Sequence, residues 1–243
     1  MKKILITGAS AGIGKSMVEV LSQKYEIYAC ARRIEKLESL KNELSDSSNF
    51  HIFKTDLNNR LELDAFVEEI PPCNILINNA GLALGSESFE NYDWSDIEIM
   101  IQTNLIALMY LTKKMIPGML KLGNGHIVNL GSVAGERSYK GGSAYCATKA
   151  AVHSFSLSLR QDLAGKNIRV TTVAPGRVHT EFSDVRFKGN LEAAKKVYSG
   201  FRTLEAVDVA RNVEWILSQP EHVNIEHITL YSTDQIDATT VVG

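Results

Sequence analysis

Thr7-Gly8-Ala9-Ser10-Ala11-Gly12-Ile13-Gly14 joins a first apolar strand directly to a helix, and this short glycine-rich turn decides the fold. Glycine lets the backbone approach a pyrophosphate closely, and a helix N-terminus offers free N–H groups and the positive end of its dipole. The spacing G-x-x-x-G-x-G differs from the commonest dinucleotide fingerprint and also fits an ordinary tight turn. Its position between a strand and a helix favours a phosphate-binding turn, with candidate contacts at Gly8, Ser10, Gly12, Ile13 and Gly14.

Apolar runs of strand length alternate with longer helical patterns along the rest of the chain. Strands are predicted at Lys3–Thr7, Glu26–Ala31, Phe50–Thr55, Asn74–Asn78, Gly125–Gly131, Ile168–Ala174 and Ile225–Leu230. Helices are predicted at about Gly12–Ser22, Ile34–Leu44, Leu61–Glu69, Trp94–Ile116, Ser143–Leu163 and Glu205–Ser218. The alternation implies right-handed βαβ crossovers and therefore an α/β fold. We expect a Rossmann-type, doubly wound parallel sheet of about seven strands with helices on both faces.

The segment Gly176–Leu204 is the longest one without clear strand character. A long insertion near the carboxyl end of a strand in such a sheet is a candidate lid, so residues 176–204 are predicted to cover the substrate. No internal repeat or low-complexity linker divides the chain. Residues 1–243 are therefore expected to form a single domain.

Composition excludes several classes of protein. The chain has 243 residues, of which 44% are hydrophobic and 22% charged, as is typical of a globular protein. A net charge of -2 without a basic block argues against nucleic acid or an anionic membrane surface as a partner. No apolar run approaches the roughly 20 residues that span a bilayer, and Ile4–Ile6 is too short for a signal peptide. Cys30, Cys73 and Cys146 lack metal-binding spacing, so we expect no metal and a reducing, cytoplasmic location.

The end of the second predicted strand indicates which cofactor binds. A site for NAD usually places Asp or Glu here to accept hydrogen bonds from the ribose 2′-hydroxyl, whereas this chain has Ala31 followed by Arg32 and Arg33. A guanidinium group matches a phosphate, and no neighbouring carboxylate in the sequence repels one. NADP(H) is therefore favoured. The alternative is that both arginines are solvated charges at the start of a helix.

Two further turns after strands offer cofactor contacts. Asp56, in Thr55-Asp56-Leu57, follows the third strand, where a carboxylate can accept a hydrogen bond from the adenine amino group. The same residue could instead cap the next turn. Small residues after the fourth strand, at Asn78, Ala80 and Gly81, would let the backbone pass beside the cofactor ribose, although such a cluster also forms ordinary turns.

Four residues are candidates for catalysis. Tyr145 and Lys149 stand at i and i+4 and share one helix face, and an ammonium within about 4–6 Å lowers a tyrosine pKa. Ser132 ends the fifth strand, where a hydroxyl can polarise a substrate oxygen or merely cap a turn. Asn104 lies inside the apolar helix Trp94–Ile116, and a buried amide there needs partners such as a water chain leading to Lys149. A solvated position on that helix is the alternative for Asn104.

These motifs together resemble the short-chain dehydrogenase/reductase family. They stand in the family's usual order, as Thr7–Gly14, Asn78-Asn79-Ala80-Gly81, Asn104, Ser132, Tyr145-x-x-x-Lys149 and Pro175-Gly176. The resemblance implies that Tyr145 is the general acid in reduction and the base in oxidation, and that Ser132 holds the substrate oxygen. It implies that Lys149 lowers the tyrosine pKa and binds the nicotinamide ribose, and that Asn104 anchors a proton-relay water. It places Pro175, Gly176, Val178 and Thr180 beside the nicotinamide, and it implies a homotetramer.

A narrower similarity connects the chain with the NADP-dependent 3-hydroxy acid dehydrogenases. The stretches that carry it include Asn79–Gly85, Thr180–Ser183, Val185–Gly189 and His222–Ile225. It implies a small acid as substrate, such as serine, allo-threonine or 3-hydroxypropionate, with Arg186 as the first candidate to bind the carboxylate and Arg177 or Arg202 next. Two departures, at Tyr231-Ser232-Thr233-Asp234-Gln235 and Gly176-Arg177-Val178-His179, leave the exact substrate open.

Two other functions remain as alternatives. The first keeps the reaction but takes an acyl chain on a carrier protein, for which the basic residues near the lid could form a docking patch: Arg186, Lys188, Lys195, Lys196 and Arg202. The second is a Rossmann-type binding protein without catalysis. The complete set of Ser132, Tyr145, Lys149 and Asn104 argues against the second.

Overall fold

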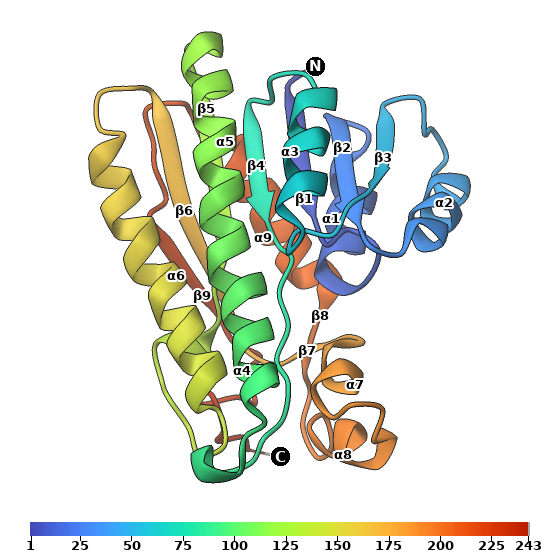
Figure 1. Ribbon diagram of the computed structural model, residues 1–243, viewed down its shortest axis with the longest axis vertical. Coiled ribbons are helices and arrows are strands. Elements are labelled where there is room, and N and C mark those ends of the chain that lie inside the picture. The colour runs from blue at the N-terminus through green and yellow to red at the C-terminus, as the bar shows by residue number, and fades with distance from the viewer. Residues whose placement is uncertain (243) are drawn as a thin grey trace.

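The computed structural model describes residues 1–242 and is built on one seven-stranded parallel sheet (Figure 1). The strands run in the order β3-β2-β1-β4-β5-β6-β9. Their bounds are β1 Lys3–Thr7, β2 Glu26–Ala31, β3 Phe50–Lys54, β4 Ile75–Asn78, β5 Gly125–Leu130, β6 Ile168–Pro175 and β9 His227–Leu230. The predicted α/β class and the seven parallel strands are confirmed. The order reverses between β1 and β4, and ligands of such sheets bind at the carboxyl ends of the strands at this point.

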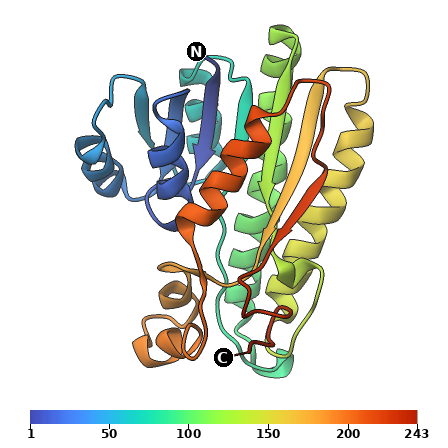
Figure 2. The ribbon, with the colours of Figure 1, turned by 180° about the vertical axis from the view of Figure 1, so that it is seen from behind.

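Helices cover both faces of the sheet, as Figures 1 and 2 show from opposite sides. One face carries α1 (Gly12–Leu21), α2 (Ile34–Glu43) and α9 (Ala206–Ser218). The other face carries α3 (Arg60–Glu69), α4 (Trp94–Ile101), α5 (Ala107–Leu122) and α6 (Ser143–Asp162). Turns of 3₁₀-helix, η1 (Phe89–Asn91) and η3 (Val133–Gly135), precede α4 and α6.

Alternation along the central strands supplies apolar side chains to both layers. Ile4 and Ile6 of β1 are fully buried and pack in one cluster with Met17 of α1. Leu5 points the opposite way and packs in the other cluster, which includes Leu111 of α5. Successive strand residues face opposite sides, so a strand without a polar face is expected where both sides are covered.

The predicted helix Trp94–Ile116 differs from the observed structure in two ways. It is interrupted by a π-helical turn, η2 (Gln102–Ile106), between α4 and α5. It also continues past Pro117 to Leu122, where Gly123 ends it in the left-handed conformation with φ of 75°. Proline removes one backbone N–H and normally breaks a helix, but Pro117 is exposed, so water can satisfy the carbonyl that loses its partner.

The segment 176–204 contains more regular structure than predicted. Two short helices, α7 (Phe182–Arg186) and α8 (Leu191–Lys196), lie beyond the carboxyl ends of the strands (Figure 1). A small parallel ladder joins β7 (Val178–His179) to β8 (Leu204–Glu205) at the two ends of the segment. The ladder closes the segment into a compact loop. Within residues 1–242, no helix combines the length and apolarity needed to cross a bilayer.

Candidate active site

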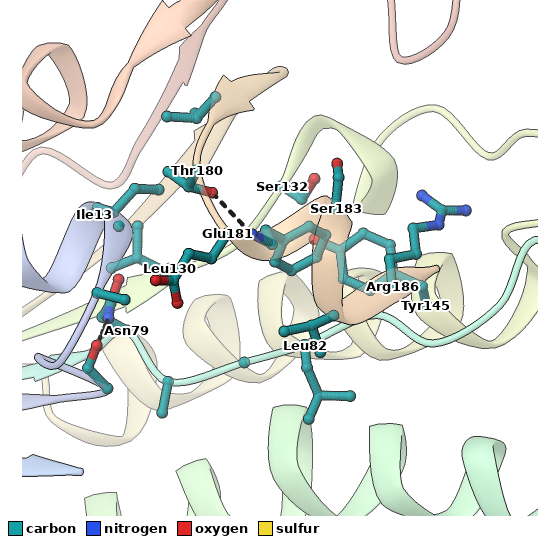
Figure 3. A pocket seen from close by; sticks show the side chains of 18 of the residues that line it. Ile13, Asn79, Leu82, Leu130, Ser132, Tyr145, Thr180, Glu181, Ser183 and Arg186 are labelled. Carbon is teal, nitrogen blue, oxygen red and sulfur yellow. Dashed lines mark hydrogen bonds between the residues drawn. The ribbon is translucent and has the colours of Figure 1, made fainter. Parts of the chain in front are cut away.

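A cavity of about 770 Å³ lies at the carboxyl ends of the strands, where the segment 176–204 covers them (Figure 3). The predicted site residues that line it are Gly8, Ser10, Gly12, Ile13, Arg32, Arg33, Asp56, Leu57, Ala80, Gly81, Ser132, Tyr145, Lys149, Pro175, Gly176, Val178, Thr180 and Arg186. Three predicted residues, Gly14, Asn78 and Asn104, do not line it. The fold therefore brings almost every candidate from the sequence to one cavity.

The glycine-rich turn is built to leave backbone donors facing this cavity. Gly8 and Gly12 adopt φ of +66° and +53°, which L side chains rarely adopt. The N-terminus of α1 has no side-chain cap, so its first N–H groups remain free for a ligand. Gly14 has a structural part in this arrangement, because a Cβ atom there would lie 2.3 Å from the Gly8 carbonyl oxygen. The turn fits a dinucleotide pyrophosphate, with Gly14 supporting it from behind.

The asparagine pair after β4 divides into one internal and one cavity residue. The predicted contact, Asn78, is buried, and its amide donates to Thr112 at 2.9 Å and to Asn129 at 2.8 Å. Its neighbour Asn79 lines the cavity and donates to the carbonyl of Thr7 at 2.9 Å. Consecutive residues of a strand face opposite sides, which explains why only one of the two reaches the cavity. The pair Asn78-Asn79 indicated a cofactor contact, but the sequence did not show which of the two side chains faces the cavity.

The two arginines after β2 meet a carboxylate that the sequence does not place beside them. Glu181, at the start of the lid segment, binds Arg33 with 3.0 Å between Nη1 and Oε2, and Lys36 with 2.5 Å between Nζ and Oε1. Lys36 and Arg33 hold the pKa of the Glu181 carboxyl below its usual range. Arg32 lines the cavity and makes no such ion pair within residues 1–242. The expectation that no carboxylate stands near Arg33 is therefore wrong, because the lid crosses to it.

Asp56 caps a turn and also stands in the wall of the cavity. One oxygen, Oδ1, accepts a hydrogen bond of 3.0 Å from the backbone N–H of Asn58, which is the turn-capping arrangement. The residue also lines the cavity together with Leu57. The other carboxylate oxygen stays available to a ligand.

Ser132 and Tyr145 lie side by side at the other end of the cavity (Figure 3). Ser132 caps η3, since its hydroxyl oxygen accepts a hydrogen bond of 3.1 Å from the N–H of Ala134. The hydroxyl proton of Ser132 is not used in this bond and can be donated to a ligand. The Tyr145 ring packs against Phe182 of α7 with 5.7 Å between centroids. Burial raises the pKa of Tyr145, and the nearby Ser132 hydroxyl opposes that rise. The phenol is consequently protonated at neutral pH and able to act as an acid.

Lys149 is buried one helical turn from Tyr145, but its ammonium group points to the backbone. Its Nζ donates 2.7 Å to the carbonyl of Leu130 and lies 5.9 Å from the centroid of the Tyr145 ring. Burial lowers the pKa of Lys149 to about 8. That Lys149 lowers the tyrosine pKa stays a prediction. Of its three N–H bonds, one is used, so two remain for a ligand.

Asn104 occupies the π-helical turn and finds its partners in the protein. Its Oδ1 accepts from the N–H of Leu82 at 2.9 Å, and its Nδ2 donates to the Leu82 carbonyl at 2.8 Å and to the Thr148 hydroxyl at 3.1 Å. The structure therefore buries Asn104 with protein partners, and the solvated position considered for it is wrong. A Cβ atom on Gly81 would lie 3.2 Å from Asn104 and 3.4 Å from Lys149, so the glycine lets the loop pass between them.

The substrate end contains the predicted Arg186 and, beside it, Tyr139, which no local motif marked. Arg186 of α7 donates from Nε to the carbonyl of Gly85 at 3.0 Å and from Nη1 to the hydroxyl of Tyr139 at 3.0 Å. Tyr139 lines the cavity beside Tyr145. Of the alternatives to Arg186, Arg177 lines the cavity but donates to the carbonyls of Val197 and Thr239. Arg202 does not line it.

Residues 2–190 match the family model described as short chain dehydrogenase. The NADP-dependent 3-hydroxy acid dehydrogenase YdfG of Escherichia coli is 43% identical over 238 residues, which cover 96% of this chain and 95% of that protein. The serine 3-dehydrogenase of Agrobacterium fabrum is 38% identical over 237 residues, which cover 96% of this chain and 94% of that protein.

Solved structures show the same similarity. A closed form of serine dehydrogenase complexed with NADP+ is 42% identical, and its match covers 99% of both chains with a TM-score of 0.93. Serine dehydrogenase from Escherichia coli is 37% identical over 96% of this chain and 99% of that one, with a TM-score of 0.83. The glycine turn, the Ser132–Tyr145–Lys149 group and these matches point to the same chemistry.

Proposed function

The chain belongs to the short-chain dehydrogenase family as an NADP-dependent oxidoreductase of CH–OH groups, and from this premise we propose that its substrate is a small 3-hydroxy acid. One observation carries the choice of substrate. The guanidinium group of Arg186 lines the same end of the cavity as Ser132 and Tyr145. A fixed guanidinium can bind a carboxylate bidentately and thereby orient the reacting carbon. The names of the most similar relatives support this class of substrate.

The chemistry follows from the positions of the hydroxyl groups. When bound, NADPH supplies the hydride that reaches the substrate carbonyl carbon, and NADP+ accepts it in the reverse direction. Ser132 donates its free proton in a hydrogen bond to the substrate oxygen and polarises it. Tyr145 transfers its phenolic proton to the same oxygen during reduction and takes it back during oxidation. The phenol carries its proton at neutral pH, so it has one to give.

Lys149 and Asn104 are proposed to hold this arrangement in place. Lys149 keeps two N–H bonds for the nicotinamide ribose while the third anchors it to Leu130. Asn104 is a positioning residue, because it binds Thr148, whose hydroxyl in turn donates 2.8 Å to the carbonyl of Tyr145. The amide therefore fixes the first turn of α6, which carries the catalytic tyrosine.

An acyl chain on a carrier protein is the competing substrate. Two of the five basic residues proposed for docking are already engaged, since Arg186 binds Gly85 and Tyr139, and Lys188 binds Asp96 at 2.7 Å. This supports the small acid. The test is the loss of NADPH absorbance with malonic semialdehyde, compared with an acetoacetyl thioester. We expect turnover of the semialdehyde, and a preference for the thioester would replace the proposal with the carrier-protein reductase.

A homotetramer in a reducing, cytoplasmic compartment completes the proposal. Of the apolar residues of α6, Val152 and Leu159 are buried, whereas Ala147 and Ala150 are exposed. Met109 of α5 is exposed as well. Such a face supports helix packing against a second copy. Light scattering at micromolar concentration should give about four times the 26.8 kDa of the chain. A particle of single-chain mass would contradict the tetramer.

The three unpaired cysteines support the proposed reducing compartment, because disulfides form and persist in oxidising ones.

A further inference from the structure

The hydroxyl group of Tyr139 is a hydrogen-bond donor without an acceptor in the wall of the cavity. Tyr139 belongs to the loop between η3 and α6, and its oxygen accepts 3.0 Å from Arg186 Nη1. Its own O–H donates to no atom of residues 1–242. Burial raises the pKa of Tyr139, so the proton stays on the oxygen at neutral pH. A partly buried donor of this kind is stabilised when a ligand supplies the acceptor.

The ring that carries this hydroxyl is held firmly. Its Cε2 atom would lie 2.5 Å from a Cβ atom on Gly142, which shows how closely the backbone packs against it. The guanidinium carbon of Arg186 lies 5.5 Å from the ring centroid. Tyr139 also packs against the cluster that contains Tyr145. Only the O–H bond is left free to rotate, so the donor is fixed in place close to the catalytic phenol.

Arg186 is anchored in a way that leaves donors for the same ligand. A guanidinium group has five N–H bonds. Three are engaged, by the carbonyl of Gly85, the Tyr139 oxygen and, at 3.4 Å, the carbonyl of Gly141. The remaining two N–H bonds are on Nη1 and Nη2 of Arg186, and Nη1 is hydrogen-bonded to the Tyr139 oxygen. These N–H bonds and the Tyr139 O–H are therefore donors on two adjacent side chains. A carboxylate has two oxygens that accept several hydrogen bonds, so it matches this set of donors.

We infer that Tyr139 is a substrate-recognition residue whose hydroxyl donates to the substrate carboxylate beside Arg186. This inference rests on the proposed function, because it assigns a second binding residue to the same 3-hydroxy acid. Tyr139 and Arg186 come from the loop before α6 and from the lid, respectively. A carboxylate bound by both would therefore connect the lid to the body of the protein above the reacting carbon.

The variant Tyr139→Phe removes the donor and keeps the ring. We expect KM for 3-hydroxypropionate to rise about tenfold, the typical effect of losing one hydrogen bond to a charged group. The kcat for this acid should stay within about twofold, because Tyr145 still supplies the proton. For methyl 3-hydroxypropionate, which keeps the reacting hydroxyl but lacks the charge, both constants should stay unchanged.

Tyr92→Phe is the matched control. The Tyr92 hydroxyl donates 2.8 Å to the carbonyl of Leu84 and packs against the same cluster, but Tyr92 does not line the cavity. This variant should change the acid and the ester alike. If Tyr139→Phe also changes both alike, Tyr139 is structural and the inference is overturned.

Binding of malonate separates this inference from the proposed function. Malonate supplies the carboxylate without a reacting hydroxyl, and calorimetry with the NADP+-saturated protein measures its Kd. We expect about tenfold weaker binding in Tyr139→Phe, with unchanged NADP+ affinity. Equal malonate affinity in both proteins, or no binding to the wild type, would overturn the role of Tyr139. If the wild type binds malonate but turns over no 3-hydroxy acid, the proposed function fails while the titration still decides the role of Tyr139.

Discussion

The two ends of the cavity are built in different ways. At the cofactor end, neighbouring strand turns are joined by short hydrogen bonds: the Thr7 hydroxyl accepts from the N–H groups of Asn79 and Ala80 at 3.1 and 3.0 Å. At the substrate end, the segment 176–204 contacts the rest of the protein through side chains, such as Arg186 on Gly85 and Lys188 on Asp96, and through a backbone hydrogen bond of 2.9 Å from the Gly85 N–H to the Arg186 carbonyl. The first end is built on the strand ends of the seven-stranded sheet, whereas the second includes a segment that lies outside this sheet.

This difference predicts how each end responds to mutation. Groups fixed by the sheet should change the reaction without changing the fold around them. A cavity residue of this segment, such as Arg186, also holds the segment to the rest of the protein, so a mutation there changes the cavity and loosens the segment together. A test of a lid residue therefore needs a control that loosens the lid alone. The experiments below are arranged from the largest expected effect to the smallest.

Tyr145→Phe should have the largest effect. The ring keeps its packing against Phe182, but the transferable proton is lost. General acid–base catalysis typically contributes about 10²–10⁴-fold, so kcat should fall by at least about 10²-fold. NADPH binding, measured by fluorescence titration, should change little. Near-normal turnover of the purified variant would remove Tyr145 from its role.

Arg186→Met tests the substrate end. We expect KM for the 3-hydroxy acid to rise at least about tenfold more than KM for its neutral ester, because charge-assisted hydrogen bonds to the carboxylate are lost. Any part of the loss shared by both substrates reports the broken contacts to Gly85 and Gly141. Steady-state kinetics with the two substrates give both parts.

Lys188→Met provides the matched control for Arg186. It breaks the ion pair with Asp96 at the end of the same segment, but Lys188 does not line the cavity. KM for the 3-hydroxy acid and KM for its neutral ester should rise equally and only slightly. If Arg186→Met behaves like Lys188→Met, Arg186 only holds the lid, and Arg177 becomes the next candidate for the carboxylate.

The combination of Ala31→Asp with Arg32→Ala tests cofactor choice at the sheet end. Arg32 is the cation without an ion pair there, since Arg33 is engaged by Glu181. We expect KM for NADPH to rise about tenfold or more, because one charge-assisted bond is lost and a like charge is added. NADH should be used as well as before or better. Equal use of both cofactors by the wild type would contradict the assignment.

The same difference between the two ends sets what the sequence could predict. Apolar runs fix the strands, and the strand ends fix the sheet edge, so Gly8, Arg32 and Ser132 could be placed from local patterns. The i,i+4 spacing placed Tyr145 and Lys149 on one helix face. For Asn104 the sequence left a buried and a solvated position open, and the structure buries it in a π-helical turn that the sequence did not predict. A continuous helix was the simplest interpretation of that stretch.

Contacts between segments that are far apart in the sequence could not be predicted, because no local sequence pattern marks them. Glu181 lies far along the chain from Arg33, and only the path of the lid brings them together. Tyr139 stands in a loop with no spacing rule, and its role depends on Arg186 arriving from another segment. For Asn78 and Asn79, the sequence left open only which of two adjacent side chains faces the cavity. The structure shows that it is Asn79. Long-range side-chain pairing, rather than secondary structure, was the missing information.

Glu181→Gln should have the smallest effect, and it tests whether the two ends are coupled. In the wild type, the Glu181 carboxylate contacts Arg33 and Lys36, the cations that a 2′-phosphate would also attract. Removing its charge should tighten binding of 2′,5′-ADP by about two- to fivefold, in keeping with the modest strength of exposed ion pairs. Binding of 5′-AMP, which lacks the 2′-phosphate, should not change. Calorimetry with both nucleotides measures the difference, and weaker binding of 2′,5′-ADP would instead mean that Glu181 supports the phosphate site. Hydrogen exchange supplies a second readout: in the wild type, 2′,5′-ADP but not 5′-AMP should increase exchange in residues 181–186, because the phosphate displaces the carboxylate that ties the lid to α2.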